Sequence, residues 1–183
     1  MTILTPARIR AMGNISRWGG WVSSPWSVLD HTLAGAILMR HQRRTAAEIR
    51  AWLLHDVEET AFMGDVPTPH KERYCNAEYY TDVRAFNAAL AEETGVKISG
   101  TVTLIKAIDE IMLRAEYATV SLKVDPEPRM DFDVVNAIAI INHSLISPSD
   151  RPVIFWQMWV QHDPDANRGD AGGMGHPPPL YTN

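Results

Sequence analysis

The spacing of apolar residues is the feature that most constrains the fold of this chain. Along most of its 183 residues the apolar side chains recur every three or four positions, and no stretch shows the alternation typical of a half-buried strand. This period predicts α-helices separated by short turns. The length suits one domain, and a hydrophobic content of 45% is sufficient for a core. We therefore expect an all-α fold, a compact bundle of about six or seven helices.

Capping residues, glycines and prolines divide the chain into the expected helices. Thr45 and Glu48 have the spacing of a capping box, and Gly95 is well suited to follow a helix end. With the apolar period, these signals predict helices over residues 6–15, 27–41, 46–64, 71–94, 99–118, 131–145 and 152–161. Turns or loops are expected in GDVPTPHK, KVDPEPRMD and SPSDRP, because proline is excluded from a helix interior.

The C-terminal segment differs in composition from the rest of the chain. Residues 163–183 are rich in glycine, proline and polar side chains, so they have little apolar surface with which to pack. We expect one domain over residues 1–162, followed by a flexible tail over residues 163–183.

Composition argues against several classes of protein. The formal net charge of −5 disfavours sequence-independent binding to nucleic acid. No window is apolar for long enough to span a membrane, and the first residues lack the pattern of a signal peptide. Cys75 is the only cysteine, so no intrachain disulfide can form. These features predict a cytoplasmic protein with no nucleic-acid partner and no membrane partner.

The segment WLLHDVEETAF places charged side chains among apolar ones. On a helix, His55, Asp56 and Glu59 would share one face within roughly 100°, beside leucines that point inward. Burying an imidazole and two carboxylates without partners would cost several kcal/mol. A metal ion removes that cost, because imidazole and carboxylate groups are usual ligands of transition metals.

Two further polar residues interrupt apolar helices elsewhere in the chain. His31 lies within SVLDHTLAGA and Asp109 within LIKAIDEIML, each at a position expected to face the core. Together with His55 and Asp56 they would supply four metal ligands from three helices. Such a set leaves coordination positions open for water and substrate.

Each of these residues also has a simpler interpretation. A lone histidine on an apolar helix, such as His31, is usually hydrogen-bonded within the core. Asp109 could form a surface ion pair with Arg114, and Glu59 could belong to a solvated acidic run with Glu58. The occurrence of all of them in one ordered pattern favours the metal site over these separate interpretations.

The ordered motifs resemble a known family. The metal-binding pattern of the HD-domain phosphohydrolases is matched by His31, His55, Asp56 and Asp109. The run HDVEET followed by GDVPTPHK, with Arg17-Trp18 upstream, is similar to one branch of that family. This branch contains bacterial deoxyribonucleoside 5′-nucleotidases and phage dATP triphosphohydrolases. The similarity extends over residues 15–117, with one departure: Asp30 precedes the first histidine, where the branch commonly has glutamate.

The resemblance implies a role for each matched residue. The four ligands would bind one divalent metal ion. Catalysis would depend on Asp56 and on Glu59, which would handle the proton of the attacking water or of the leaving oxygen. Phosphate oxygens would be met by Arg17, Lys71 and Lys106. Trp18 would pack on the deoxyribose or the base, and Asp65 would hold a sugar hydroxyl group.

The resemblance also implies the reaction and its cofactors. The favoured reaction is hydrolysis of dATP, or another dNTP, to the deoxynucleoside and triphosphate. The alternatives are a 5′-nucleotidase acting on deoxyribonucleoside monophosphates and a non-catalytic nucleotide-binding HD protein. The ligand set suits Zn, Mn, Co, Fe or Ni, and a second ion such as Mg would accompany the phosphates.

Assembly and location are further expectations from the resemblance. We expect a homo-oligomer in the cytoplasm, which for a bacteriophage-encoded enzyme is the cytoplasm of the host. The apolar segment VIFWQMWV is either the interface of that oligomer or the last core helix.

Overall fold

The computed structural model describes residues 2–62, 64–66, 68–122, 130–143 and 146–163. In these residues the regular structure is helical throughout, which confirms the predicted all-α bundle. The α-helices are α1 (Pro6–Met12), α2 (Val28–His41), α3 (Ala46–Leu54), α4 (Thr68–Tyr74), α5 (Ala77–Thr94), α6 (Val102–Thr119), α7 (Phe132–His143) and α8 (Arg151–Gln161). Short 3₁₀ helices are η1 (Arg17–Gly20), η2 (Val57–Thr60) and η3 (Ile98–Gly100). Residues 164–183, most of the expected tail, lie outside the described residues.

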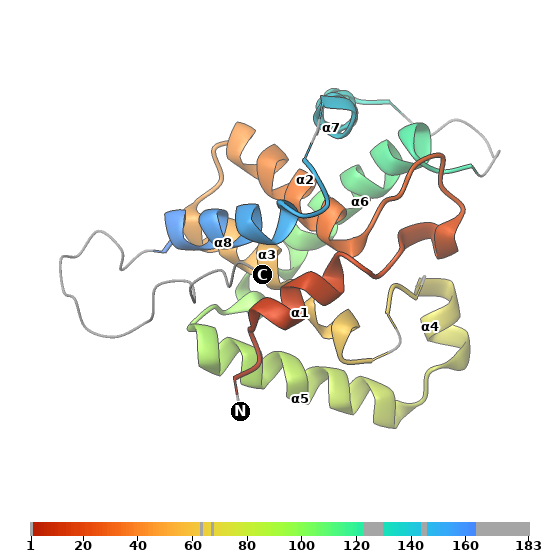
Figure 1. The fold of residues 1–183 in the computed structure, drawn as a ribbon. Coiled ribbons are helices and arrows are strands. Elements are labelled where there is room, and N and C mark those ends of the chain that lie inside the picture. The colour runs from red at the N-terminus through yellow and green to blue at the C-terminus, as the bar shows by residue number, and fades with distance from the viewer. Residues whose placement is uncertain (1, 63, 67, 123–129, 144–145, 164–183) are drawn as a thin grey trace.

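Helix α2 is the central element of the bundle. All residues from Val28 to Ala36 are buried, and the helix contacts α1, α3, α6, α7 and α8. Figure 1 shows it between α7 on one side and α1 on the other, with α5 along the opposite edge of the molecule. A helix covered on all sides must be apolar nearly all round. A polar side chain on α2, such as His31, therefore has to find its partners inside the protein.

Capping side chains fix where α2 and α3 begin. The Thr45 hydroxyl accepts a hydrogen bond from the backbone N–H of Glu48, and the Glu48 carboxylate accepts one from the backbone N–H of Thr45. This confirms the predicted capping box. Ser27 and Asp30 form the same arrangement at the start of α2. The Asp30 carboxylate also pairs with Arg151 of α8, at 2.7 Å from its Nε.

The predicted single helix over residues 71–94 is wrong. The chain forms two helices there, α4 and α5, because the Asn76 side chain accepts a hydrogen bond from the backbone N–H of Tyr79 and caps a new helix. Helix α4 also begins at Thr68, inside the segment predicted to be a turn. Proline is accepted in a first helical turn, where its missing N–H would have no partner. The remaining helices match their predicted ranges to within a few residues, except the one that follows Thr45.

The predicted helix over residues 46–64 is wrong in its second half. The backbone N–H of His55 donates to the carbonyl of Trp52 at 3.2 Å, and that of Glu59 donates to Asp56 at 3.1 Å. Both bonds span three residues, so the chain tightens into 3₁₀ turns after α3. His55, Asp56 and Glu59 therefore do not share one continuous helical face, although they remain close along the chain.

A glycine in α2 allows the closest contact in the core. A Cβ atom at Gly35 would lie 2.2 Å from Cζ2 of the Trp52 ring, so only glycine fits there without a shift. Trp52 is fully buried, and its indole Nε1 donates a hydrogen bond to the backbone carbonyl of Thr32 at 2.8 Å. Helix α3 is thereby fixed against α2, and this contact sets where the chain places His55.

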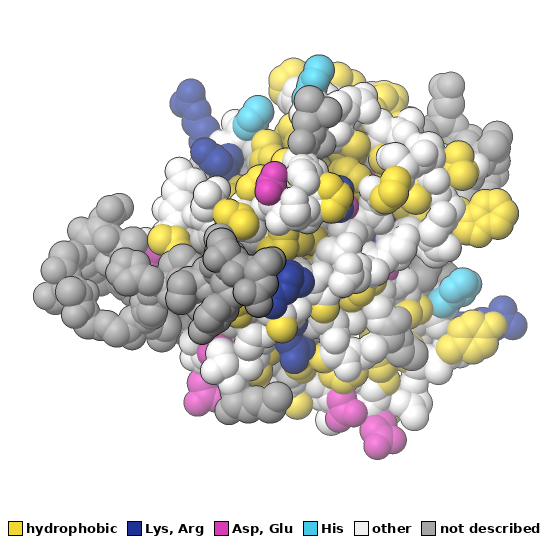
Figure 2. Space-filling view, in the orientation of Figure 1, with side chains coloured by type: hydrophobic (Ala, Val, Ile, Leu, Met, Phe, Trp, Pro, Cys, Tyr) yellow, Lys and Arg dark blue, Asp and Glu magenta, His cyan; other side chains and the backbone are white. Residues whose placement is uncertain are grey.

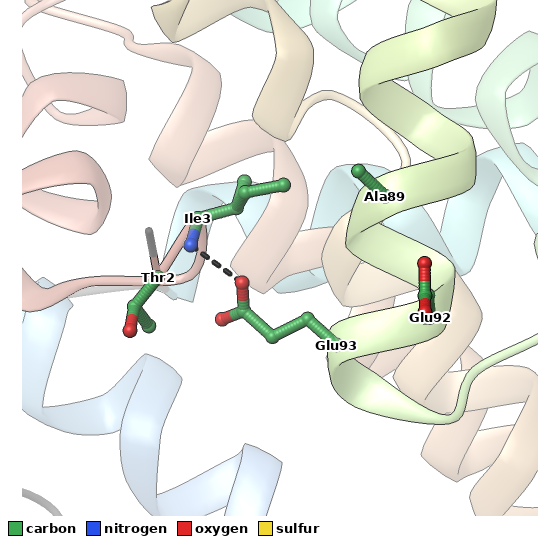
Figure 3. A pocket seen from close by; sticks show the side chains of 5 residues that line it. All are labelled: Thr2, Ile3, Ala89, Glu92 and Glu93. Atoms are coloured by element: carbon green, nitrogen blue, oxygen red, sulfur yellow. Dashed lines mark hydrogen bonds between the residues drawn. The ribbon is translucent and has the colours of Figure 1, made fainter.

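The surface hollow shown in Figure 3 lies between the N-terminal segment and α5. The Glu93 carboxylate accepts hydrogen bonds from the backbone N–H groups of Ile3 and Leu4, at 2.5 and 3.0 Å, and fastens the N-terminus to α5. The lining residues are Thr2, Ile3, Ala89, Glu92 and Glu93. None of them is a predicted site residue, so this hollow is separate from the candidate centre.

The last described helix belongs to the core. Phe155, Met158 and Trp159 of α8 are buried, as the core interpretation of VIFWQMWV expects, whereas Val160 is 43% exposed, and the interface interpretation stays a prediction. Exposed apolar side chains gather instead at α7 (Figure 2), where Phe132 is 80% exposed and Val135 is 51% exposed. None of the described helices combines the length and the apolar character needed to cross a membrane.

Candidate metal centre

Three predicted ligands converge between α2 and the segment that follows α3. His31 lies in α2, His55 directly follows α3, and Asp56 precedes η2. One ligand atom from each of the three lies within 4.8 Å of the others. Asp56 Oδ2 is 3.0 Å from His55 Nε2 and 3.8 Å from His31 Nε2. The group thus has the ligand types and the spacing to hold a metal ion.

The fourth predicted ligand, Asp109 of α6, lies beside His31 but outside the group formed by His31, His55 and Asp56. Its Oδ1 lies 3.3 Å from His31 Nε2, and its side chain is 50% exposed, so it stands at the open edge of the cluster. The alternative ion pair with Arg114 is not formed. Arg114 instead lies within ion-pair distance of Glu110 and of Asp131, at 3.7 and 2.9 Å.

Hydrogen bonds on the far side of each imidazole turn the Nε2 atoms toward the cluster. His55 Nδ1 lies 2.6 Å from the Trp52 carbonyl oxygen, and His31 Nδ1 lies 2.6 Å from a Glu116 oxygen. Both partners can only accept, so both Nδ1 atoms carry the proton. The two Nε2 atoms are buried and form no hydrogen bond of good geometry among the described residues, although oxygens of Asp56 and Asp109 lie 3.0 Å from His55 Nε2 and 3.3 Å from His31 Nε2, respectively. An unsatisfied buried nitrogen is costly, and a metal ion would satisfy both.

The ring of Trp52 supports the two imidazoles. It stacks on His55 with ring centroids 4.0 Å apart and an interplanar angle of 22°, and its centroid lies 5.3 Å from that of His31. The tryptophan wedged against Gly35 therefore also fixes the ligand rings. In this way the packing of α3 on α2 is connected directly to the geometry of the centre.

Glu116 is a member of the site that was not predicted from the sequence. It is fully buried in α6, its Oε1 contacts His31, and its Oε2 accepts hydrogen bonds from Arg17 Nε at 2.9 Å and from Trp18 Nε1 at 3.2 Å. It follows Asp109 by seven residues, which is two helical turns along one face. That spacing was readable in the sequence and would have drawn attention to it.

Arg17 and Asp65 lie together beside Glu116. Arg17 is buried, and its Nη1 is 3.7 Å from Asp65 Oδ1. Burial opposes the charge of the guanidinium, but the carboxylates of Glu116 and Asp65 hold its pKa above the ordinary value. Arg17 is thus paired with carboxylates on both sides of its guanidinium. Trp18 follows in η1 with a left-handed backbone, at φ 59°.

Glu59 and Lys71 form a second charged pair near Asp56. Lys71 Nζ lies 3.5 Å from Glu59 Oε1, and Glu59 is only 7% exposed, so it is not part of a solvated acidic run. Burial raises the pKa of Glu59, and the nearby carboxylates of Asp56 and Asp65 raise it further. Its neighbour Glu58 is similar, since burial and Asp56 raise its pKa to about 7.

Two predicted site residues of α6 are open to solvent: the Asp109 side chain is 50% exposed, and Lys106 is exposed. Lys106 lies one turn before Asp109, and among the described residues it forms no ion pair with a carboxylate of the centre. The other predicted residues are buried or half-buried around the cluster. The structure therefore places Lys106 at the rim.

The charges of the centre favour a cation. Burial and Arg17 oppose the charged form of His31, yet Glu116 and Asp109 outweigh them and raise its pKa to about 9. Burial opposes the charged form of Asp56, but His55, His31 and Arg17 together hold its pKa below the ordinary value. Carboxylates outnumber the permanent cations here, so the site attracts positive charge.

Comparison with known proteins identifies no relative of this chain. Neither the protein-family models nor the curated proteins contain a match to the chain. The resemblance to HD-domain phosphohydrolases stays a prediction from the motif residues.

Proposed function

We propose that the protein is a metal-dependent phosphohydrolase that acts on deoxynucleotides. Within that class we propose the dATP triphosphohydrolase reaction, in which dATP or another dNTP yields the deoxynucleoside and triphosphate. The observation that carries the proposal is the convergence of His31, His55 and Asp56, with both imidazole Nε2 atoms buried and facing carboxylate oxygens. A cluster of this kind, from separated segments, is expected where a metal ion binds.

The metal ligands would be His31, His55, Asp56 and Asp109. Two nitrogens and two carboxylates suit Zn, Mn, Co, Fe or Ni. When bound there, the ion supplies a Lewis acid that lowers the pKa of water and polarises a phosphoryl oxygen.

We assign the proton transfer to Glu59, as the motif resemblance implies. It is buried, its pKa is raised, and one of its oxygens has no hydrogen-bond partner in the described part of the chain. A carboxyl group with a raised pKa can take up a proton and release it near neutral pH. Lys71, at 3.5 Å, keeps the other oxygen of Glu59 in place.

The phosphate and sugar groups would lie on the side of Arg17 and Trp18. Arg17 brings a positive charge next to the cluster, and Lys106 brings one from the rim of α6. The Trp18 ring lies 5.8 Å from the ring of Tyr117, which supports it as a flat surface for the deoxyribose or the base. Asp65, beside Arg17, is an acceptor for a sugar hydroxyl group.

One observation favours the 5′-nucleotidase reaction as the second candidate. Arg17 and Lys71, the cations nearest the cluster, are both already paired with carboxylates. A triphosphate carries more negative charge than a monophosphate and needs more cations around it. A deoxynucleoside monophosphate would therefore be accommodated with less rearrangement.

Product analysis separates the candidates. Purified protein is incubated with dATP, dAMP or ATP in the presence of Mn²⁺ or Co²⁺, and the products are resolved by chromatography. Deoxyadenosine with triphosphate is the result we expect, and deoxyadenosine from dAMP would support the second candidate. Asp56→Ala should abolish turnover, whereas Asp82→Ala, on the exposed surface of α5, should retain it. Absence of turnover by the wild-type protein with every nucleotide would leave a non-catalytic binding protein.

A further inference from the structure

Glu116 contacts His31 of the candidate metal centre and also the adjacent residues Arg17 and Trp18. One oxygen faces the metal-ligand histidine of α2, and the other faces two adjacent side chains of η1. We propose that Glu116 is a positioning residue that fixes His31 for metal binding and, at the same time, fixes the Arg17-Trp18 pair. The metal-binding role of His31 and the assignment of that pair to the nucleotide both rest on the proposed function.

The contact with His31 determines which nitrogen can bind a metal. Glu116 Oε1 and His31 Nδ1 are 2.6 Å apart, and both side chains are completely buried, so no solvent competes for this bond. The carboxylate keeps a proton on Nδ1, so Nε2, which faces Asp56 and Asp109, is the nitrogen that a metal ion would bind after displacing its proton. Acceptors of this kind orient a ligating histidine and make it a stronger ligand.

The contact with η1 restrains an unfavourable backbone. Trp18 has φ 59°, a left-handed backbone conformation that residues other than glycine rarely adopt. Its indole N–H donates to Glu116 Oε2, and Arg17 Nε donates to the same oxygen. These two bonds hold the segment against α6. Loss of the acceptor would therefore remove one hydrogen bond from each of these two side chains.

No neighbouring carboxylate can take over this role. Asp30 precedes His31 directly and is also buried, but it caps α2 and pairs with Arg151. Asp65 contacts only the outer end of the Arg17 guanidinium, at 3.7 Å. Asp30 is for this reason a matched control: it is a buried carboxylate beside the same histidine, with its contacts directed elsewhere.

The isosteric variant Glu116→Gln tests whether Glu116 supports metal binding by His31. A glutamine amide offers one acceptor oxygen, so it can serve His31 or the Arg17-Trp18 pair but not both. Titration calorimetry with Mn²⁺ should show about 10- to 100-fold weaker binding for Glu116→Gln. Asp30→Asn should stay close to the wild-type affinity. Wild-type affinity in a folded Glu116→Gln variant, or an equal loss in Asp30→Asn, would overturn the proposal.

Magnetic resonance tests both contacts without any need for turnover. In the Zn²⁺-loaded wild-type protein, long-range ¹H–¹⁵N spectra should show His31 protonated at Nδ1, and a metal-bound Nδ1 would overturn the proposal even if the glutamine variant does not fold. The Trp18 indole N–H resonance, assigned with Trp18→Phe, should move upfield in Glu116→Gln and stay in Asp30→Asn. Failure of hydrolysis with every nucleotide would reject the proposed reaction and leave these results interpretable.

Discussion

Two buried imidazoles define the chemistry at the residue scale. Because Nδ1 of His55 is bound to the Trp52 carbonyl and Nδ1 of His31 is bound to Glu116, each ring has one nitrogen left, and both of these nitrogens point into the cluster. The sequence supplied the residue types and their order. The spacing of seven residues from Asp109 would have placed Glu116 on the same face of its helix, but it does not show that Glu116 contacts His31, Arg17 and Trp18.

Glu59 should be required for turnover but not for metal binding. Glu59→Gln keeps the size of the side chain and removes its ability to exchange a proton, so we expect kcat to fall by about 10²- to 10⁴-fold. The affinity for Mn²⁺, measured by calorimetry, should change little. Glu58→Gln is the matched control, because Glu58 has a similarly raised pKa. A larger loss of kcat in Glu58→Gln than in Glu59→Gln would show that Glu58, and not Glu59, transfers the proton.

Trp18 should determine the preference for deoxyribose. If its ring lies against C2′ of the sugar, a ribose hydroxyl would clash with it, and Trp18→Ala should remove that clash. We expect the ratio of kcat/KM for dATP to that for ATP to fall in Trp18→Ala. The comparison variant is Trp21→Ala, whose side chain is 66% exposed in the neighbouring loop. Continued rejection of ATP by Trp18→Ala would count against this role.

At the scale of the elements, tight packing places the ligands. Helix propensity favoured a helix running through HDVEETA, but the chain leaves the α-helix after Leu54, and the sequence gives no local signal for that break. The break between α4 and α5 could have been predicted from the sequence, because Asn76 precedes Tyr79 with the spacing of an N-cap. Helix interiors were thus predicted well from apolar spacing, whereas ends set by tertiary contacts were not.

Gly35→Ala should destabilise the fold although alanine is the better helix former. Alanine favours a helix interior by about 1 kcal/mol over glycine, but its Cβ would meet the Trp52 ring at 2.2 Å. Overpacking of a core typically costs about 1–3 kcal/mol, so we expect a net loss of stability in urea denaturation, accompanied by weaker metal binding. Gly100→Ala, where no atom lies within 4 Å of the added Cβ, should be tolerated. Equal stability of the two variants would refute the close contact.

The capping box of α3 should contribute a pH-dependent part of the stability. Hydrogen bonds from the backbone N–H and the hydroxyl of Thr45 lower the pKa of Glu48 in the folded protein. A lowered carboxylate pKa stabilises the fold above the unfolded-state pKa, and this contribution is lost as the pH falls through the folded-state value. Between pH 6 and pH 3, Glu48→Gln should lose less stability than the wild-type protein, by about 0.3–1 kcal/mol. Chemical denaturation at both pH values measures this, and Glu92→Gln, outside any cap, should behave like wild type.

At the scale of the whole molecule, the site exists only because distant segments meet. His31 on α2, the turn after α3 and Asp109 on α6 are brought together by helix packing around the buried α2. Polar residues on apolar helices predicted that these segments would converge. The position of Lys106 at the rim, and the pairing of Arg17 with Glu116, depend on side-chain directions that periodicity does not determine.

The most direct test of the account is a crystal structure of the Mn²⁺-loaded protein, with anomalous scattering measured at the manganese edge. We predict one strong anomalous peak at about 2.0–2.3 Å from His31 Nε2, His55 Nε2 and carboxylate oxygens of Asp56 and Asp109. A peak bound elsewhere, or its absence from between these four side chains at saturating Mn²⁺, would contradict the account.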